Sequence, residues 1–211
     1  MAIARDSRVV RPELLDGLDP ADPNAIRSRK DLRYLNLLMG TSSWIGCQLA
    51  RQNPATLSEI GAGEGLLSTQ LSRRFPKMSI TGIDRIARPT ALPPVIDWKS
   101  QDIFATDFHS DAVVGSMILH HFTDDQLLEL GARLRHARVL CFCEPWRHSY
   151  SRALGVLTSP FWGRITRHDL PVSVNAGFIP GELPYFLGLS RWHVEESVDW
   201  RGSTRLLAWR E

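Results

Sequence analysis

The chain has 211 residues, of which 43% are hydrophobic and 23% are charged, and its formal net charge is +2. This length and composition predict one globular domain with a sizeable core, because two independent cores would each be small. The small net charge and the scattered basic residues argue against a nucleic-acid-binding protein.

The first quarter of the chain predicts two helices. About the first 20 residues are polar and interrupted by prolines, and we expect them to be irregular. Asp22-Pro23 is typical of a helix start, and Gly40 is a plausible stop. An apolar stripe at helical spacing lies between them, formed by Ile26, Leu32, Leu35, Leu38 and Met39. A basic group on the same helix is expected to be a solvated face, with phosphate binding as the alternative: Arg27, Arg29, Lys30 and Arg33. A second helix is predicted over residues 42–51.

From residue 56 the pattern alternates between strands and helices. Apolar runs predict strands over residues 56–61, 78–84, 95–99, 111–117 and 137–143. A helix is predicted after the first strand, where apolar residues recur at helical spacing: Leu66, Leu67, Leu71 and Phe75. Another is predicted over residues 124–135, behind a capping box at Thr123 and Gln126. Residues 85–95 contain three prolines, each costing about 3 kcal/mol in a helix interior, so no helix, or only a very short one, is expected there.

The end of the chain predicts a strand pair, over residues 192–198 and 204–210, joined by the hairpin-like link WRGS. Alternating strands and helices followed by such a pair predict an α/β fold. We expect its sheet to be mostly parallel with an antiparallel edge.

The stretch EIGAGEG, residues 59–65, separates the first strand from its helix. Gly61 can turn the chain, Gly63 leaves room for a ligand to approach the backbone, and Gly65 lets the helix start close to the strand. The free N–H groups of the helix N-terminus favour a carboxylate or a phosphate. The dinucleotide pattern G-x-G-x-x-G is not met, because Leu66 follows Gly65 directly and the third glycine is missing.

Acidic residues follow the next two strands. Asp84 ends the second strand, about 20 residues after the glycines, where a carboxylate can accept hydrogen bonds from both ribose hydroxyls; an NAD site also uses such an acid. After the third strand, Asp102 could accept from an adenine amino group while Ile103 covers the ring. The fourth strand opens into GSMILHHF, which places three residues over the expected cofactor pocket: Met117, Leu119 and His120.

With these four motifs in this order, residues 55–145 resemble the class I S-adenosylmethionine-dependent methyltransferases. The resemblance implies a Rossmann-like, seven-stranded sheet with an antiparallel last strand, helices on both faces and an N-terminal helical lid. It implies S-adenosyl-L-methionine as cofactor and S-adenosyl-L-homocysteine as product. The resemblance also implies that the methionine end of the cofactor is lined by Glu59, Gly61, Ala62 and Gly63, that Asp84 binds the ribose and that Asp102 binds the adenine. The expected cofactor-binding residues are Glu59, Gly61, Ala62, Gly63, Gly65, Asp84, Arg85, Asp102, Ile103 and Met117. In the family a helix usually joins strands two and three, so here Arg85 or Ile86 is expected to cover the adenine instead.

We expect a single methyltransferase domain over residues 1–211. Residues 1–54 would form the helical lid, 55–145 the cofactor-binding core, and 146–211 a substrate-lid segment with the C-terminal strand pair. The LHHF motif and the capped helix after it are most similar to the small-molecule branch of the family. The expected acceptor is therefore a small molecule, such as an aromatic, quinone or polyketide-type hydroxyl or carbon. The aromatic residues of 146–190 suit an apolar acceptor, or a lid that only excludes water.

Methyl transfer from a sulfonium can rely largely on proximity and alignment. A base is needed only if the nucleophile is protonated. His120 is the candidate catalytic base, because its unperturbed pKa lies near neutral pH; the alternative is a plain loop residue. Glu144, which ends the fifth strand, is expected to contact the substrate or to pair with Arg147.

Two further functions stay open from the sequence. One is a non-catalytic accessory protein that binds S-adenosylmethionine or S-adenosylhomocysteine. The other is an NAD-dependent oxidoreductase, which the missing third glycine disfavours. A nucleic-acid methyltransferase is disfavoured by the lack of a basic stripe and of an Asn/Asp-Pro-Pro-aromatic tetrapeptide.

The three cysteines, Cys47, Cys141 and Cys143, are too few for a disulfide framework and fit a reducing compartment. Cys141 and Cys143 would share one face of a strand and pack in the core. That region offers too few ligands for a metal, so no metal site is expected. There is no signal-peptide pattern, and no apolar run approaches the roughly 18 residues that span a bilayer. We expect a cytoplasmic protein.

Overall fold

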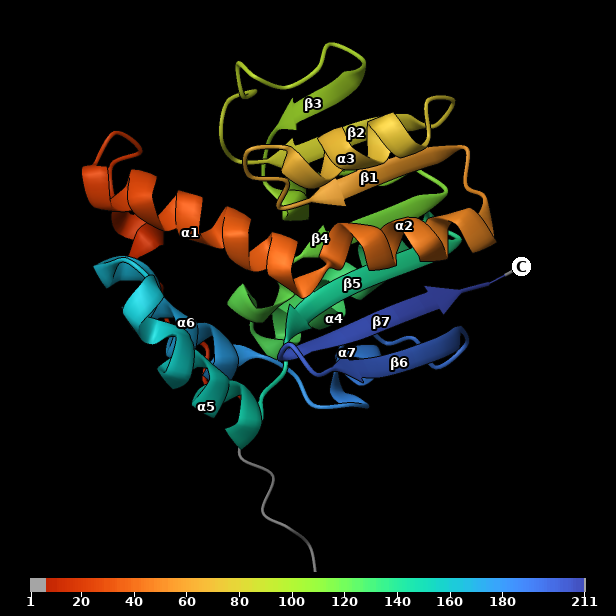
Figure 1. Ribbon diagram of the computed structural model, residues 1–211. Helices are drawn as coiled ribbons and strands as arrows, with labels where there is room; N and C mark the ends of the chain where they lie inside the picture. Colours follow the sequence, from red (N-terminus) through yellow and green to blue (C-terminus); the bar gives the residue numbers. More distant parts are fainter. Residues whose placement is uncertain (1–6, 211) are drawn as a thin grey trace, which may run out of the picture.

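The computed structural model describes residues 7–210, and a seven-stranded sheet forms its centre (Figure 1). The strand order is β3-β2-β1-β4-β5-β7-β6. The strands are β1 (Thr56–Ile60), β2 (Ser79–Asp84), β3 (Ile96–Ser100), β4 (Ala112–Ser116), β5 (Val139–Pro145), β6 (His193–Asp199) and β7 (Ser203–Trp209). Neighbours from β3 to β5 pair in parallel, and β7 runs antiparallel to β5 and β6. The predicted antiparallel last strand is confirmed, but it lies one place in from the edge, which β6 forms.

Seven α-helices of the described chain surround this sheet. They are α1 (Pro23–Met39), α2 (Thr41–Gln52), α3 (Leu66–Arg74), α4 (Asp124–Arg133), α5 (Ser149–Thr158), α6 (Arg164–Ala176) and α7 (Glu182–Phe186). Residues 85–95 hold no helix, as the prolines predicted. Within residues 7–210, no helix combines the length and the apolar character needed to cross a membrane.

Local capping interactions fix the helix ends that the sequence predicted. The side chain of Asp22 accepts a hydrogen bond from Asn24 N at 2.7 Å at the start of α1, and Gly40 ends that helix with φ 64°. At the start of α4, Thr123 and Gln126 form a reciprocal capping box. These contacts satisfy backbone groups that a helix end otherwise leaves without partners.

The sheet buries one apolar cluster on each face. Along β5, Leu140 and Phe142 pack on the face covered by α4 and α7, whereas Cys141 and Cys143 pack on the face covered by α2 and α3 (Figure 1). Every residue of β5 is buried, as expected for a central strand between two helical layers. The predicted core position of the two cysteines is therefore confirmed. Of the two N-terminal helices, α2 packs on a face of the sheet, and α1 lies beyond the strand ends.

A separate layer of helices, α1, α5 and α6, lies beyond the carboxyl ends of the parallel strands (Figure 1). The buried face of α1 is largely polar, and its predicted apolar stripe does not mark that face: Ile26 is 53% exposed and Leu38 62%. Instead, the Asp31 carboxylate accepts a hydrogen bond from Gly163 N at 2.7 Å, at the start of α6. A carboxylate that accepts a hydrogen bond from the first backbone N–H groups of a helix stabilises that helix. A polar contact therefore joins α1 to the N-terminus of α6.

The first described residues run over the same strand ends. Arg8 donates to the carbonyl oxygens of Phe122 and Ala176, and the N–H groups of Leu14 and Leu15 donate to Asp169 on α6. The only regular structure between residues 7 and 20 is a 3-10 turn over Leu15–Gly17. The predicted irregular conformation is confirmed for this part, and residues 1–6 lie outside the described chain.

The contact between α4 and α7 gives a stability test. A Cβ added at Gly131 would lie 2.1 Å from the carbonyl oxygen of Leu187. We expect Gly131→Ala to lower the free energy of unfolding by about 1–3 kcal/mol, the usual cost of overpacking, measured by urea unfolding. The control is Gly17→Ala, where a Cβ meets nothing within 4 Å, and its effect should stay within about 0.5 kcal/mol. Equal losses in both variants would contradict the close packing.

Candidate functional site

The EIGAGEG stretch forms a tight turn between β1 and α3. Gly61, Gly63 and Gly65 all adopt left-handed backbone conformations, with φ of 61°, 52° and 70°. Gly65 N donates to the carbonyl of Ala62 at 2.8 Å, and Ala62 N donates to the carbonyl of Ile83 at 3.2 Å. The first hydrogen bond closes the turn, and the second links the turn to β2. Glycine adopts this conformation at little steric cost, which explains all three positions.

The space around the three glycines differs. A Cβ at Gly61 would lie 2.5 Å from the side chain of Ile118, and one at Gly65 would lie 2.3 Å from Leu92. A Cβ at Gly63 would meet nothing within 4 Å. Packing therefore requires the outer two glycines, whereas Gly63 faces open space at the carboxyl end of β1.

Asp84 ends β2 beside this turn. One of its carboxylate oxygens accepts a hydrogen bond from Gly63 N at 2.8 Å, and the other accepts from Ile86 N at 3.2 Å. A carboxylate offers about four lone-pair sites, so two bonds leave capacity for hydroxyl groups of a ligand. The structure thus brings together Asp84 and the glycine turn, as the sequence predicted.

Asp102 and its neighbours are engaged in other contacts. Asp102 accepts from Phe104 N at 2.8 Å and pairs with Arg85 at 2.7 Å. The hydrogen bond from Phe104 is the largest cause that lowers the pKa of Asp102, and Arg85 adds to it. Ile103 is 7% exposed and belongs to the apolar cluster under α4. Asp102 therefore has less free hydrogen-bonding capacity than Asp84, and the three predicted cofactor contacts of Arg85, Asp102 and Ile103 stay predictions.

Hydrogen bonds hold the proline-rich link 85–95 in place. They come from Arg88 and Trp98, which the sequence did not single out. The Arg88 guanidinium donates to the carbonyl oxygens of Leu92, Pro93 and Ile96, at 3.4, 2.8 and 2.6 Å. Trp98 Nε1 donates to the carbonyl of Ile86 at 3.2 Å. The sequence alone does not indicate this role of Arg88, because its three carbonyl partners are brought together only by the fold.

Glu59 lies under the glycine turn and is 4% exposed. Its carboxyl accepts hydrogen bonds from both the N–H and the hydroxyl of Ser68, in α3. Burial raises the pKa of Glu59 to about 7, because the two bonds from Ser68 offset only part of the desolvation. Glu59 therefore titrates near neutral pH. Its predicted contact with the methionine end of a cofactor stays a prediction.

The loop after β4 carries backbone strain. Met117 has φ 56°, a left-handed conformation that non-glycine residues rarely adopt, and its N–H donates to the carbonyl of Cys143 at 2.9 Å. Such strain costs about 1–3 kcal/mol and often occurs at functional sites. Leu119, predicted to line the cofactor pocket, is instead fully buried in the core.

Glu144 holds this loop in place. Its carboxylate is completely buried and accepts from the backbone N–H groups of Ile118, Leu119 and His120, at 3.0, 2.9 and 3.3 Å. It also lies 2.8 Å from Nδ1 of His120. The predicted pair with Arg147 is wrong, because Arg147 pairs with Glu182 at 2.6 Å. Glu144 is a positioning residue for the loop, rather than an exposed contact.

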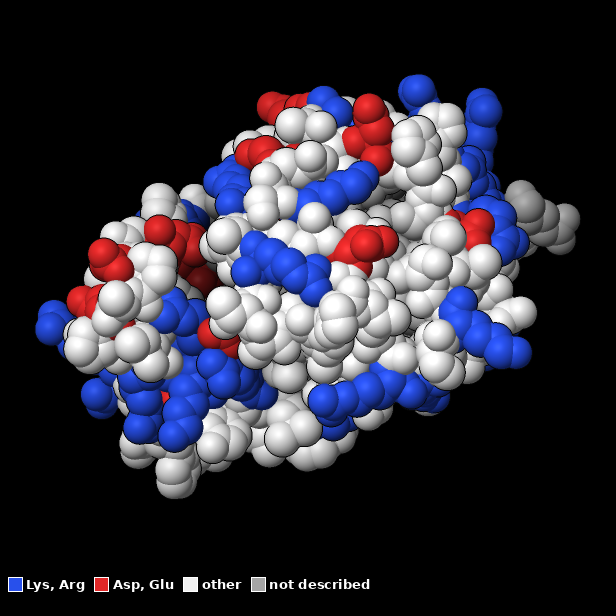
Figure 2. All heavy atoms as spheres, turned by 90° about the horizontal axis from the view of Figure 1, so that it is seen from above, with Lys and Arg blue, Asp and Glu red and all other residues white. Residues whose placement is uncertain are grey.

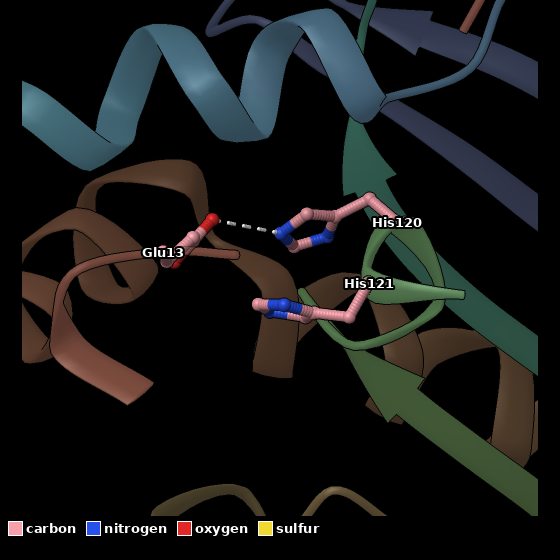
Figure 3. A group of neighbouring side chains, drawn as sticks. All are labelled: Glu13, His120 and His121. Atoms are coloured by element: carbon pink, nitrogen blue, oxygen red, sulfur yellow. Dashed lines mark ion pairs between the residues drawn. The ribbon is translucent and has the colours of Figure 1, made fainter. Parts of the chain in front are cut away.

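His120 lies between the carboxylates of Glu13 and Glu144, and Figure 3 shows its contact with Glu13. It is 3% exposed, and Nε2 lies 3.5 Å from Glu13 Oε1 while Nδ1 faces Glu144. Desolvation lowers the pKa of His120, but the hydrogen bonds to Glu13 and Glu144 outweigh it and raise the pKa to about 9. At neutral pH the ring is therefore protonated and can donate but not accept a proton. A base role for His120 stays a prediction that requires a weaker contact with Glu13.

Helix α1 reaches the glycine turn through Glu64. Arg33 pairs with Glu64 at 2.7 Å and Arg29 lies 3.7 Å from it, so two members of the predicted basic group contact this turn. Figure 2 shows a recess between the layer that contains α1 and the body of the sheet, on a face where basic and acidic side chains are interspersed. Exposed pairs of this kind are worth about 0–1 kcal/mol each, so they add little to the position of α1, which its buried contact with α6 also holds.

No family model and no curated protein sequence matches the chain. Solved structures do match. The plantazolicin methyltransferase BpumL, in complex with a monoazolic desmethylPZN analog and SAH, superposes with a TM-score of 0.71 at 11% identity, over 90% of this chain and 91% of its own. Magnesium protoporphyrin IX methyltransferase from Synechocystis PCC 6803 gives 0.61 at 17% identity, over 86% of each chain. Human N-acetylserotonin methyltransferase gives 0.58 at 17% identity, over 92% of this chain.

The chain has the class I methyltransferase fold. It spans 61% of the length of human N-acetylserotonin methyltransferase and 63% of that of the methyltransferase SibL, which are longer proteins. The glycine turn and Asp84 lie in this fold at the carboxyl ends of β1 and β2, the edge where open α/β sheets bind their ligands.

Replacing the buried carboxyl at Glu59 is expected to flatten the pH dependence of stability. Since its pKa rises from 4.5 to about 7 on folding, the folded protein binds this proton more tightly than the unfolded chain. The resulting stabilisation is full below the unfolded pKa and is lost as the pH rises through about 7, a loss of roughly 3 kcal/mol.

Urea unfolding at pH values from about 5 to 8 measures this effect. Glu59→Gln should reduce the downward slope between about pH 5 and 7, whereas Glu129→Gln, on an exposed side chain of α4, should keep it. The slope that remains above about pH 6.5 comes from His120, whose pKa also rises on folding, to about 9. An unchanged slope in Glu59→Gln would show that Glu59 is already ionised in the folded protein.

Proposed function

We propose that the chain is an S-adenosylmethionine-dependent methyltransferase that transfers a methyl group to a small-molecule acceptor. The observation that carries this proposal is the open space beside Gly63, bordered by Asp84 at the end of the adjacent strand. The backbone can be approached closely there, and a carboxylate is available for ribose hydroxyls. This combination suits the nucleoside part of S-adenosylmethionine.

In this proposal, Glu59, Gly61, Ala62 and Gly63 line the methionine end of the cofactor. Asp84 binds the ribose, and Asp102 binds the adenine. Met117, in its strained conformation beside the turn, lies next to the cofactor. The bound cofactor supplies an activated methyl group on a sulfonium, and the protein aligns the acceptor for in-line displacement.

The acceptor is proposed to be aromatic, a quinone, or a polyketide-type hydroxyl or carbon. The aromatic residues of 146–190 support this class, for example Trp146, whose ring stacks on His148 with centroids 4.1 Å apart. The matched structures include enzymes named for N-acetylserotonin and for magnesium protoporphyrin IX, which are both ring systems. The N-terminal segment and α1 would close over the acceptor and exclude water. His120 would orient or deprotonate an acceptor hydroxyl through Nε2, once that nitrogen is released from its contact with Glu13.

Two alternatives are retained. A non-catalytic protein would bind the same cofactor without turnover, and an NAD-dependent oxidoreductase would use Asp84 for its own ribose. Leu66, in place of a third glycine, disfavours the second alternative. The small net charge of +2 gives no support to a nucleic-acid acceptor. A cytoplasmic location belongs to this proposal as well.

Calorimetric titration with S-adenosylhomocysteine, and separately with NAD, tests the cofactor. We expect micromolar binding of S-adenosylhomocysteine, no binding of NAD, and at least a tenfold loss in Asp84→Ala, because the ribose loses its acceptor. NAD binding alone would replace the methyltransferase with the oxidoreductase. Binding of S-adenosylhomocysteine, with no turnover of S-adenosylmethionine in an acceptor screen, would favour the accessory protein.

A pair of glycine variants tests where the cofactor lies. Gly63 and Gly181 both have left-handed φ, 52° and 91°, and a Cβ at either meets nothing within 4 Å. Alanine should therefore strain both positions similarly. Gly63→Ala is expected to weaken S-adenosylhomocysteine binding at least tenfold because its methyl group fills the ligand space, whereas Gly181→Ala, at the start of α7, should bind normally. Equal affinities would move the cofactor away from Gly63.

A further inference from the structure

We infer that Glu13, His120 and His121 form a binding site for a divalent transition-metal ion. One ligand atom of each side chain lies within 4.8 Å of the others, and Figure 3 shows the three side chains gathered at one point. Glu13 comes from the N-terminal segment, and the two histidines come from the turn after β4. The cluster thus joins two parts of the chain that are far apart in the sequence.

The spacing suits a first-row ion. Donor atoms bound at about 2.1 Å to one ion lie roughly 3.0–3.5 Å apart at tetrahedral or octahedral angles. Glu13 Oε1 and His120 Nε2 are 3.5 Å apart. The rings of His120 and His121 are neighbours, with centroids 4.2 Å apart at a 35° tilt. Small side-chain movements therefore bring all three donor atoms to an ion.

The surroundings orient these ligands as a metal site requires. The Nδ1 atom of His120 is bonded to the buried Glu144 at 2.8 Å, which directs Nε2 toward Glu13. Metal-binding histidines usually donate their second ring nitrogen to a carboxylate in this way, which fixes the tautomer and the ring. Glu13 is held in turn, because the hydroxyl of Ser173 donates to its Oε1. The two carboxylates beside the ring of His120, those of Glu13 and Glu144, also favour the binding of a cation.

The donor set indicates the class of ion. Two histidines and one carboxylate bind zinc in catalytic sites that keep a further position open, and the same set is typical of non-haem iron(II). The most accessible side lies at His121, whose side chain is 25% exposed and whose Nδ1 lies 3.7 Å from Asp16. An acceptor oxygen could take an open position there. That role rests on the proposed function, whereas the metal site does not.

The cluster lies close to the glycine turn. Ile118, two residues before His120, is the residue that a Cβ on Gly61 would strike. An ion held by His120 and His121 would thus stand at the same strand ends as the proposed cofactor. The sequence predicts no metal site, because the region of the cysteine pair offers too few ligands. Two adjacent histidines do not form a recognised metal-binding spacing. The third ligand, Glu13, lies more than 100 residues away in an irregular segment, so the sequence does not reveal the cluster.

Titration of the metal-free protein with Co²⁺ tests the site without any cofactor. We expect one ion per chain, with visible d–d absorption bands, and release of the ion to Zn²⁺. Glu13→Gln and His121→Ala should each weaken Co²⁺ binding by about 100-fold or more. Glu13→Gln keeps the shape of the side chain, and His121 does not contact Glu144, so circular dichroism and urea unfolding should show both variants folded.

The matched control removes two exposed histidines of another pair, His109 and His136, whose ring centroids are 6.5 Å apart. The double variant to alanine should bind Co²⁺ as the unmodified chain does. Equal Co²⁺ affinity in Glu13→Gln and the unmodified chain would overturn the site, as would a Co²⁺ absorption spectrum that the protein leaves identical to that of free aqueous Co²⁺. S-adenosylhomocysteine binding, measured on the same samples, reports separately on the proposed function.

Discussion

The buried carboxylate of Glu144 is the contact on which the candidate site depends. It ends β5 and accepts the backbone N–H groups of the turn that follows β4, together with a ring nitrogen of His120. A buried charge is costly unless it is fully hydrogen-bonded, and this one is bonded by groups of a single turn. The turn is consequently held in one arrangement, with His120 facing the N-terminal segment.

This arrangement links three layers of the protein. The central sheet supplies Glu144, the turn supplies the histidines, and the N-terminal segment supplies Glu13, which Ser173 of α6 also contacts. The helical layer beyond the strands is itself joined by polar contacts, such as that of Asp31 with Gly163. The sheet therefore gives rigidity, while the covering layer is joined to the turn through polar contacts, such as those of Glu13, as well as through buried apolar side chains of α6.

The sequence predicted the sheet and the glycine turn well, and the covering layer poorly. Strands, caps and glycine positions follow from local periodicity and from residues such as Asp22, Thr123 and Gly40, whose chemistry acts on their own neighbours. The partners of Glu144, Asp31 and Arg88 depend on the packing of distant segments, which no local pattern encodes. The apolar stripe of α1 was misleading for the same reason, because its neighbour α6 offers hydrogen-bonding groups rather than an apolar face.

The two ends of the described chain lie at opposite ends of the parallel strands. Residues 8–15 run over the carboxyl ends of the parallel strands, whereas Trp209, at the end of β7, pairs with Val139 at the start of β5. A dye or surface linker attached at Val9, which is 42% exposed, therefore stands on the side of the strand ends that carries the candidate site. The same group attached after β7 is separated from that site by the length of the sheet, and this is the end by which the protein is best immobilised.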